Sequence, residues 1–204
     1  MKIDFPTIIP KFDKILERGL CGGVGKPDGQ MCIEAAITQA MDLPFNDAPS
    51  CVSNAVRRYK IKLNDSSYWT SPESRARGLR NLGIAQIGSE GVVDDAEFTK
   101  RLAEKTIRVL IPTLFRERFP ENARCLAAAD RCEKEGTAEA AMEAQASAYA
   151  SASASASASA AASASAASAG RTDEDKYLLL SASLALEVLQ ELKSPGCEWL
   201  EWSA

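Results

Sequence analysis

The chain of 204 residues contains no histidine. Serine and cysteine nucleophiles that depend on an imidazole base are therefore excluded, as are haem and zinc sites that use a histidine ligand. Any general base must be a carboxylate, a lysine, a tyrosine or a thiolate. This absence removes most familiar catalytic constellations, so the sequence leans toward a binding function rather than an enzymatic one.

Patterns of secretion, membrane insertion and structural zinc are missing as well. Residues 1–6 lack the apolar segment of a signal peptide, and no run of about 18 apolar residues could cross a bilayer. No paired C-x-x-C spacing relates the six cysteines, which are Cys21, Cys32, Cys51, Cys125, Cys132 and Cys197. We therefore expect a cytoplasmic protein with reduced thiols, no membrane association, no metal and no cofactor.

An excess of basic residues is also absent, because the net charge is −4. This balance disfavours a protein that binds duplex nucleic acid. The charge is uneven, however: residues 57–118 carry thirteen Lys or Arg and eight Asp or Glu, which leaves +5. This local excess has two interpretations. One is an anion-binding face, and the simpler one is a solvated helix surface.

The most distinctive segment that is present is a glycine-rich loop at residues 20–30, which runs into a patterned helix. Glycine lets a backbone approach a ligand or a neighbouring helix closely, and a helix start offers free N–H groups to an anion. Two nucleotide motifs fail here. Pro27 follows Gly25-Lys26 where a P-loop needs Ser or Thr, and no apolar strand precedes the loop as a dinucleotide fingerprint requires.

Generic anion capture at this helix start nevertheless remains a candidate function, and a purely structural loop is the alternative. The residues that we assign to such a ligand site are Gly22, Gly23, Gly25, Lys26, Gln30, Arg57 and Arg58.

Cys32 is a weak candidate nucleophile, because a helix N-terminus can lower the pKa of a thiol. No histidine can serve as its base, and Glu34 is expected to point to another side of the helix. Packing of Cys32 against Cys51 is the alternative, and convergence of these two with Cys21 would permit a metal or redox site. The carboxylates Asp28, Glu34 and Asp47 could likewise gather for Mg²⁺ binding or acid–base chemistry, or could serve only as caps and turns.

Helical patterns dominate the rest of the chain. Pro10 is expected in the first turn of a helix over 11–18, and Pro112 is expected to kink a helix over 95–115. Cys125 and Cys132 recur with Ala128 and Ala129 at helical spacing, which indicates a core face rather than metal ligands. Further helices are predicted over 29–41, 50–63 and 72–83, from about 121, and over 173–192.

Alanine and serine make up nearly all of residues 144–169. A long helical arm of small residues is the favoured interpretation, and a disordered spacer is the alternative. The fold prediction is therefore all-α: a compact helical core over residues 1–143, an Ala/Ser arm over 144–170, and a C-terminal helix and tail over 171–204 that pack back on the core. The wide leucine stripe of the last helix needs such a partner.

Three stretches, residues 21–37, 43–56 and 181–201, resemble an uncharacterised group of phage and bacterial proteins. Members of the group share a Gly-rich start, an M-C-x-E-A-A helix, a D-x-P-x-C-V turn and a variable Ala-rich middle. The resemblance implies a phage or mobile-element context, and it assigns no activity and no catalytic residue.

The sequence therefore predicts a non-enzymatic protein that binds a small anionic, nucleotide-like ligand and in a phage would sequester a host signal. One alternative is a protein–protein inhibitor or scaffold that acts through the helical arm, with a homo-oligomer among its forms. The other is a cysteine-dependent enzyme that uses Cys32.

Overall fold

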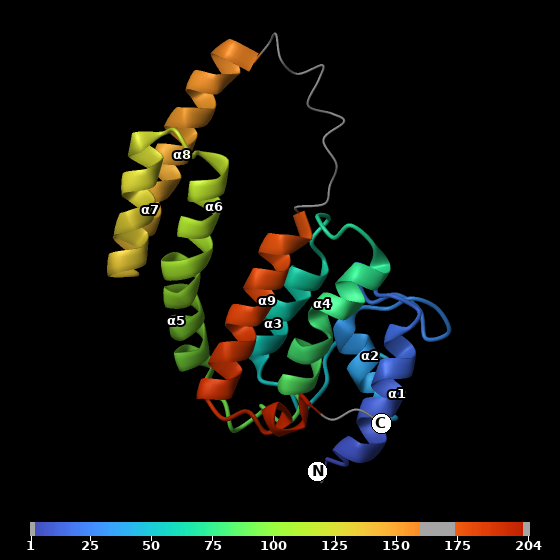
Figure 1. Ribbon diagram of the computed structural model, residues 1–204. Coiled ribbons are helices and arrows are strands. Elements are labelled where there is room, and N and C mark those ends of the chain that lie inside the picture. The colour runs from blue at the N-terminus through green and yellow to red at the C-terminus, as the bar shows by residue number, and fades with distance from the viewer. Residues whose placement is uncertain (1–2, 160–173, 202–204) are drawn as a thin grey trace. The chain divides into compact units, whose positions relative to one another are not determined.

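The computed structural model describes residues 3–159 and 174–201, and it confirms an all-α protein (Figure 1). Extended pairing within these residues is limited to isolated bridges of Met31 with Leu20 and Gly25. None of the described helices combines the length and apolar character that crossing a bilayer requires. The chain divides into two compact units, which we describe separately: residues 1–101 with 174–204 form unit 1, and residues 102–173 form unit 2.

Unit 1 is built around a short helix that is buried on almost every side. Helix α2 (Ile33–Ala40) contacts α1 (Phe5–Leu16), α3 (Asn54–Asn64) and α4 (Pro72–Ala85), and all but one of its residues are buried. Unit 1 also contains the start of α5 (Asp95–Lys105), α9 (Glu174–Glu191) and the 3-10 turn η4 (Pro195–Trp199). A helix so enclosed forces whatever polar residue it carries into the core.

Three helix starts differ from the prediction. Helix α1 begins at Phe5 and holds Pro10 in its interior, because Asp4 accepts the first backbone N–H groups and Pro6 occupies the first turn. Helix α2 begins at Ile33 rather than at residue 29, since Met31 is engaged in the two isolated bridges and the next residue serves as N-cap. The third helix likewise starts later, at residue 54, after a turn over residues 49–52.

The C-terminal segment packs on helices of unit 1. Helix α9 contacts α4, and the Tyr59 hydroxyl donates to the Ser181 carbonyl at 2.7 Å. The Ser194 hydroxyl donates to the Ala85 carbonyl at 2.5 Å, and the Trp199 ring stacks on Phe5 with centroids 5.2 Å apart. Trp202, which was also expected to fold back, lies outside the described residues.

Unit 2 is a helical assembly with an alanine-rich core. It contains the end of α5, the π-helical turn η1 (Thr106–Leu110), α6 (Ile111–Arg118), α7 (Ala123–Glu135) and α8 (Ala138–Ser159). Cys125 and Cys132 are buried there, which confirms that they belong to a core. Ala140 and Ala144 pack in the same cluster as Phe115, so the helices after residue 101 join α8 rather than the expected core over 1–143. The arm is helical through residue 159, and its remainder lies outside the described residues.

Pro112 interrupts the long helix by a π-helical turn rather than by breaking it. Proline has no N–H to donate to the carbonyl of Arg108, and its ring crowds that carbonyl. The wider turn over 106–110 ends two residues before Pro112, and α6 then continues to Arg118.

Arg108, which lies in this turn, caps the end of α7. Its guanidinium donates to the carbonyls of Glu133, Lys134 and Glu135 at 2.7–2.9 Å. The last carbonyls of a helix have no intrahelical donor, and a cation there also opposes the helix dipole. Gly136 ends α7 in the left-handed conformation and lies directly under the Arg108 side chain.

We expect Arg108→Met to lower the free energy of unfolding by about 1–2 kcal/mol, because the apolar stem is kept while four charge-assisted hydrogen bonds are lost from a half-exposed site, three to the α7 carbonyls and one to Glu104. Urea unfolding followed by helical circular dichroism measures the change. Arg124→Met, at an exposed position of α7, the helix that Arg108 caps, is the matched control and should stay within about 0.5 kcal/mol of the wild type. Equal loss in both variants would contradict the capping role.

Candidate functional site

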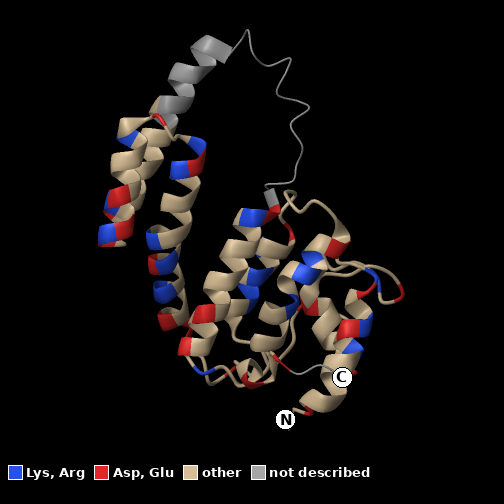
Figure 2. Ribbon diagram, in the orientation of Figure 1, with Lys and Arg blue, Asp and Glu red and all other residues tan. Residues whose placement is uncertain are grey.

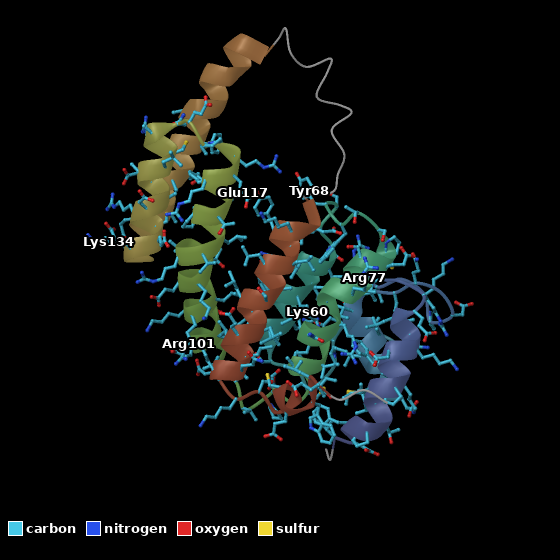
Figure 3. The ribbon with its side chains drawn as sticks, in the orientation of Figure 1. Lys60, Tyr68, Arg77, Arg101, Glu117 and Lys134 are labelled. Atoms are coloured by element: carbon cyan, nitrogen blue, oxygen red, sulfur yellow. The ribbon has the colours of Figure 1, made fainter. Side chains whose placement is uncertain are left out.

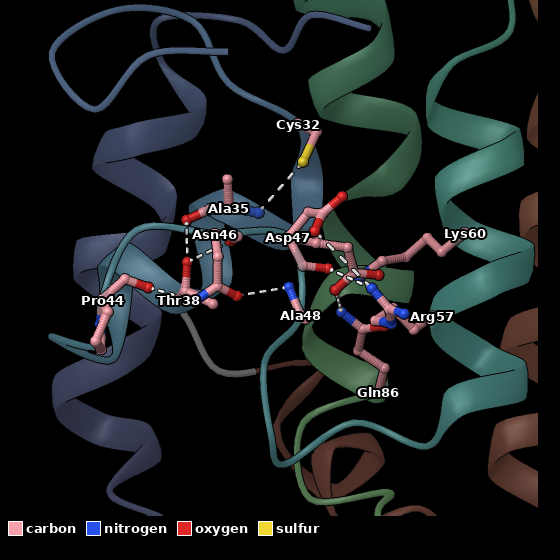
Figure 4. Close-up of polar contacts among 11 residues, drawn as sticks. Cys32, Ala35, Thr38, Pro44, Asn46, Asp47, Ala48, Arg57, Lys60 and Gln86 are labelled. Atoms are coloured by element: carbon pink, nitrogen blue, oxygen red, sulfur yellow. Dashed lines mark hydrogen bonds and ion pairs between the residues drawn. The ribbon is translucent and has the colours of Figure 1, made fainter. Parts of the chain in front are cut away.

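Three polar residues meet in the core of unit 1 around α2. Glu34 comes from the first turn of α2, Lys60 from α3, and Gln86 is the C-cap of α4. The side chains of Glu34 and Lys60 have no solvent-exposed area, and Gln86 is fully buried as well. We call these residues the Glu34 cluster; Figure 3 labels Lys60 among the helices of unit 1, and Figure 4 shows the surroundings at close range.

The Glu34 cluster is joined by one ion pair and one hydrogen bond. Lys60 Nζ lies 3.3 Å from Glu34 Oε1, and Gln86 Nε2 donates to Glu34 Oε2 at 2.9 Å. The ion pair is not aligned as a hydrogen bond, so within the part of the chain that the structure describes Lys60 Nζ and Glu34 Oε1 have no hydrogen-bond partner, and Gln86 Oε1 has none either. Buried polar atoms with unused capacity are uncommon and often mark functional sites.

Burial sets the electrostatics of the pair. It raises the pKa of Glu34 to about 7, although the Lys60 ammonium and the Arg57 guanidinium both oppose the shift and Asp47 adds to it. Burial lowers the pKa of Lys60, and the Glu34 carboxylate opposes that shift. The carboxyl group can therefore change its charge near neutral pH, which an exposed glutamate does not do.

The carboxylates of the predicted acidic group are only partly brought together. Asp47 acts electrostatically on Glu34, and it is paired with Arg57, whose Nη1 lies 3.1 Å from the Asp47 carbonyl and 3.9 Å from its carboxylate (Figure 4). Asp28 lies exposed in the glycine-rich loop. Within the described chain no group of three or more histidine, cysteine, aspartate or glutamate residues is arranged to hold a metal ion.

Cys32 is the N-cap of α2, and its sulfur accepts a hydrogen bond from the Ala35 N–H at 3.4 Å (Figure 4). Burial raises the pKa of this thiol to about 11 despite the backbone N–H groups that favour the thiolate. The expectation that the helix N-terminus lowers the Cys32 pKa is therefore wrong, because desolvation of the thiolate outweighs the dipole.

The three N-terminal cysteines divide between two surroundings. Cys32 and Cys51 are both buried and both act electrostatically on Lys60, so they lie around the Glu34 cluster. Cys21 is half-buried instead, and its charged neighbours are Arg75 and Asp65.

The glycine-rich loop directs several of its N–H groups at acceptors of this chain. Gly23 donates to the Asp65 carboxylate at 2.9 Å, and the first N–H of α2, from Ile33, donates to Asn64 Oδ1 at 3.2 Å. Cys32 N–H donates to the Val24 carbonyl at 3.2 Å. An acidic side chain of the protein thus occupies a position where the sequence suggested an external anion.

The other predicted ligand residues are dispersed. Gln30 Nε2 donates to the Arg18 carbonyl at 3.0 Å, and Arg57 is engaged by Asp47. Lys26 in the loop and Arg58 on α3 are exposed, and neither forms an ion pair with a described residue. Gly22, Gly23 and Gly25 lie exposed in the loop.

Sequence reasoning missed Lys60 and Gln86. A signal for both is visible in retrospect: Lys60 falls four residues after Val56 and three before Leu63, on the apolar stripe of α3, and Gln86 interrupts the apolar run of residues 84–87. A charged residue on an otherwise apolar stripe predicts a buried partner.

Comparison with known proteins adds no relative: no protein-family model, no curated protein and no solved structure matches the chain. The functional argument therefore depends on the geometry of the described residues.

Proposed function

We propose that this chain is a non-enzymatic binding protein of a phage or mobile element, and that its binding element is the helical arm of unit 2. The non-enzymatic part of this proposal rests on one observation, which is the burial of the side chains that could act as nucleophile, acid or base. Cys32, Glu34 and Lys60 are each less than 5% exposed, and Cys32 holds a protonated thiol at neutral pH. A substrate has no access to these groups in the folded state.

Two features of unit 2 support the arm as the binding element, namely its length and the residues on the neighbouring helices. Helix α8 has 22 residues and α7 has 13, so at about 1.5 Å per residue α8 is the longer by about 14 Å. Along α6 and α7, acidic and basic residues are interspersed (Figure 2), and Arg116 pairs with Asp130 and Glu133. The apolar side chains of Met142 and Val109 stay 60% and 38% exposed on this unit.

The described side chains of α8 that are buried, those of Ala140, Ala144 and Ser147, all precede residue 150, so removal of residues 150–169 tests the arm with these contacts in place. We expect the deletion to abolish capture of a protein partner from extracts of a phage host, while the thermal unfolding of unit 1 is unchanged. A variant in which a Gly/Ser linker of equal length replaces 150–169 is the matched control, and it should also lose the partner. Retention of the partner by the linker variant, or capture of none by the intact chain, would contradict the proposal.

A small anionic ligand is the second candidate, and the observation that favours it is that Lys26 and Arg58 are exposed and form no ion pair with another described residue. Labelled nucleotides should then bind the purified protein, and Lys26→Ala combined with Arg58→Ala should abolish binding whereas the arm deletion should not. Nucleotide binding that is unchanged by both substitutions would exclude this candidate.

A further inference from the structure

The Glu34 cluster contains unused hydrogen-bonding atoms of both kinds. Lys60 Nζ, Glu34 Oε1 and Gln86 Oε1 are all buried, and none of them has a hydrogen-bond partner among the residues that the structure describes. Lys60 Nζ is a donor, and the two oxygens are acceptors. An unbonded polar group is costly in a protein core, so three of them in one cluster point to a bound molecule that completes their hydrogen bonds.

The three atoms surround a single carboxylate. Lys60 Nζ lies 3.3 Å from Glu34 Oε1, and Gln86 Nε2 donates to the other carboxylate oxygen at 2.9 Å. Gln86 Oε1 belongs to the same amide group as this donor. The ammonium carries three N–H groups and the amide oxygen can accept two hydrogen bonds, so the contacts within the cluster leave most of this capacity unused.

The mixed set of donor and acceptors selects a neutral ligand. A bound cation would be repelled by the Lys60 ammonium, and a bound anion would face two acceptor oxygens, one of them on the Glu34 carboxylate. Glu34 and Lys60 balance each other's charge, so a neutral molecule adds no charge to the core. Because both side chains have no exposed area, the site favours the smallest neutral molecule that can both donate and accept, which is water.

A half-exposed ion pair gives water a way to the Glu34 cluster. Asp47 and Arg57 both act electrostatically on Glu34, and their side chains are 39% and 28% exposed. The Arg57 guanidinium lies 3.9 Å from the Asp47 carboxylate, which is a loose contact (Figure 4). Local opening of this pair lets water reach the cluster while α2 stays folded.

We propose that the Glu34 cluster holds one structural water molecule, which accepts a hydrogen bond from Lys60 Nζ and donates one to Gln86 Oε1. Its second O–H can then donate to Glu34 Oε1, so that the water joins all three side chains of the cluster. The inference does not depend on the function proposed for the arm, because the Glu34 cluster lies wholly in unit 1.

A crystal structure of the full chain tests the site directly. We expect an electron-density peak at about 2.7–3.2 Å from both Lys60 Nζ and Gln86 Oε1. Crystals grown with rubidium bromide as the salt identify the bound species, because Rb⁺ and Br⁻ scatter anomalously and water does not. An anomalous peak at this position would mean an adventitious ion, and either that result or no peak at all would overturn the proposal.

Two variants test whether the polar cluster holds the water. Lys60→Met combined with Glu34→Gln removes both charges with little change in side-chain volume, so it should fold and should lack the peak. Lys62→Met, at an exposed position of α3, is the matched control and should keep the peak. A peak of equal height in the wild type and in the charge-free variant would contradict the assignment of the water to Lys60.

Discussion

Replacing Lys60 with methionine should destabilise unit 1 by about 3–5 kcal/mol at pH 8, the largest effect we expect from a single side chain. Methionine fills much of the lysine volume, so the loss comes from charge. Glu34 would remain in the core without its cationic partner, at a position with no exposed area, so at pH 8 it must either take up a proton against the solution pH or stay as an unpaired charge, and both cost stability. Gln86 would still donate one hydrogen bond to the Glu34 carboxylate, and Arg57 would still act on it through space, but neither replaces an ion pair at 3.3 Å.

The double variant Lys60→Met with Glu34→Gln is the matched control. Glutamine can accept the hydrogen bond from Gln86, and no charge is left in the core, so we expect most of the lost stability to return. Urea unfolding of all variants, followed by helical circular dichroism and by tryptophan fluorescence, gives the comparison. If the double variant were as unstable as Lys60→Met, the loss would lie in the packing of the lysine stem and the charge argument would fail.

The pH dependence of the free energy of unfolding gives a second, independent signature of the Glu34–Lys60 pair. The pKa of Glu34 rises from an ordinary value of 4.5 to about 7 in the folded protein, so the folded state holds the proton longer than the unfolded state. This group's contribution to stability therefore falls as pH rises from about 4.5 to about 7 and is then constant. The lowered pKa of Lys60 acts at alkaline pH. There the contribution of Lys60 to stability rises as the pH rises, until the pH reaches the ordinary lysine pKa of 10.5.

In Lys60→Met the main cation that holds down the Glu34 pKa is gone, so the carboxyl should keep its proton above pH 7 as well. Stability should then continue to fall by about 1.4 kcal/mol per pH unit between pH 7 and 8, where the wild-type contribution from Glu34 is flat. The charge-free double variant should lack this slope. Urea unfolding midpoints measured at pH 6, 7 and 8 test this expectation. If the midpoints of Lys60→Met and of the double variant changed with pH in parallel, the assignment of the slope to Glu34 would be refuted.

The sequence could predict helices and their apolar faces, because side-chain periodicity is a local property. Cys125 and Cys132 fall on such a face and are buried as expected. Glu34 shows where periodicity fails. Its place on α2 follows from the sequence, but its burial depends on how many helices surround α2, and that number is a tertiary property. Lys60 and Gln86 could be matched to Glu34 only once α3 and α4 were placed beside α2.

The partners of the glycine-rich loop could not be predicted for a related reason. Its glycines correctly indicated a backbone that needs unusual angles, since Gly23 and Gly25 adopt φ values of +67° and +77°. The partners of the loop, Asn64 and Asp65, lie at the end of α3, some forty residues further along the chain. Nothing local to either segment shows that they meet, so a loop bonded within the protein and a loop open to an external anion have the same sequence pattern.

Three alanine substitutions in this loop should have strongly graded effects. Gly29→Ala should change stability by no more than about 0.5 kcal/mol, because its φ lies outside the left-handed region and an added Cβ would meet Lys26 Cβ at 3.8 Å. Gly23→Ala should cost about 1 kcal/mol, from the left-handed backbone alone, since nothing lies within 4 Å of an added Cβ. Gly25→Ala should cost about 2–4 kcal/mol, because a left-handed backbone combines with a clash.

The clash at Gly25 also distinguishes a structural loop from a ligand-binding one. An added Cβ would lie 2.3 Å from the Gln30 carbonyl oxygen, 2.5 Å from Met31 Cα and 2.8 Å from Cys21 Sγ, all of them atoms of this protein. The loss in Gly25→Ala should therefore appear in urea unfolding of the protein alone, without any ligand. If Gly25→Ala instead unfolded like Gly29→Ala and lost only nucleotide binding, then Gly25 would be required for close approach to a ligand, and the anion hypothesis would displace the structural one.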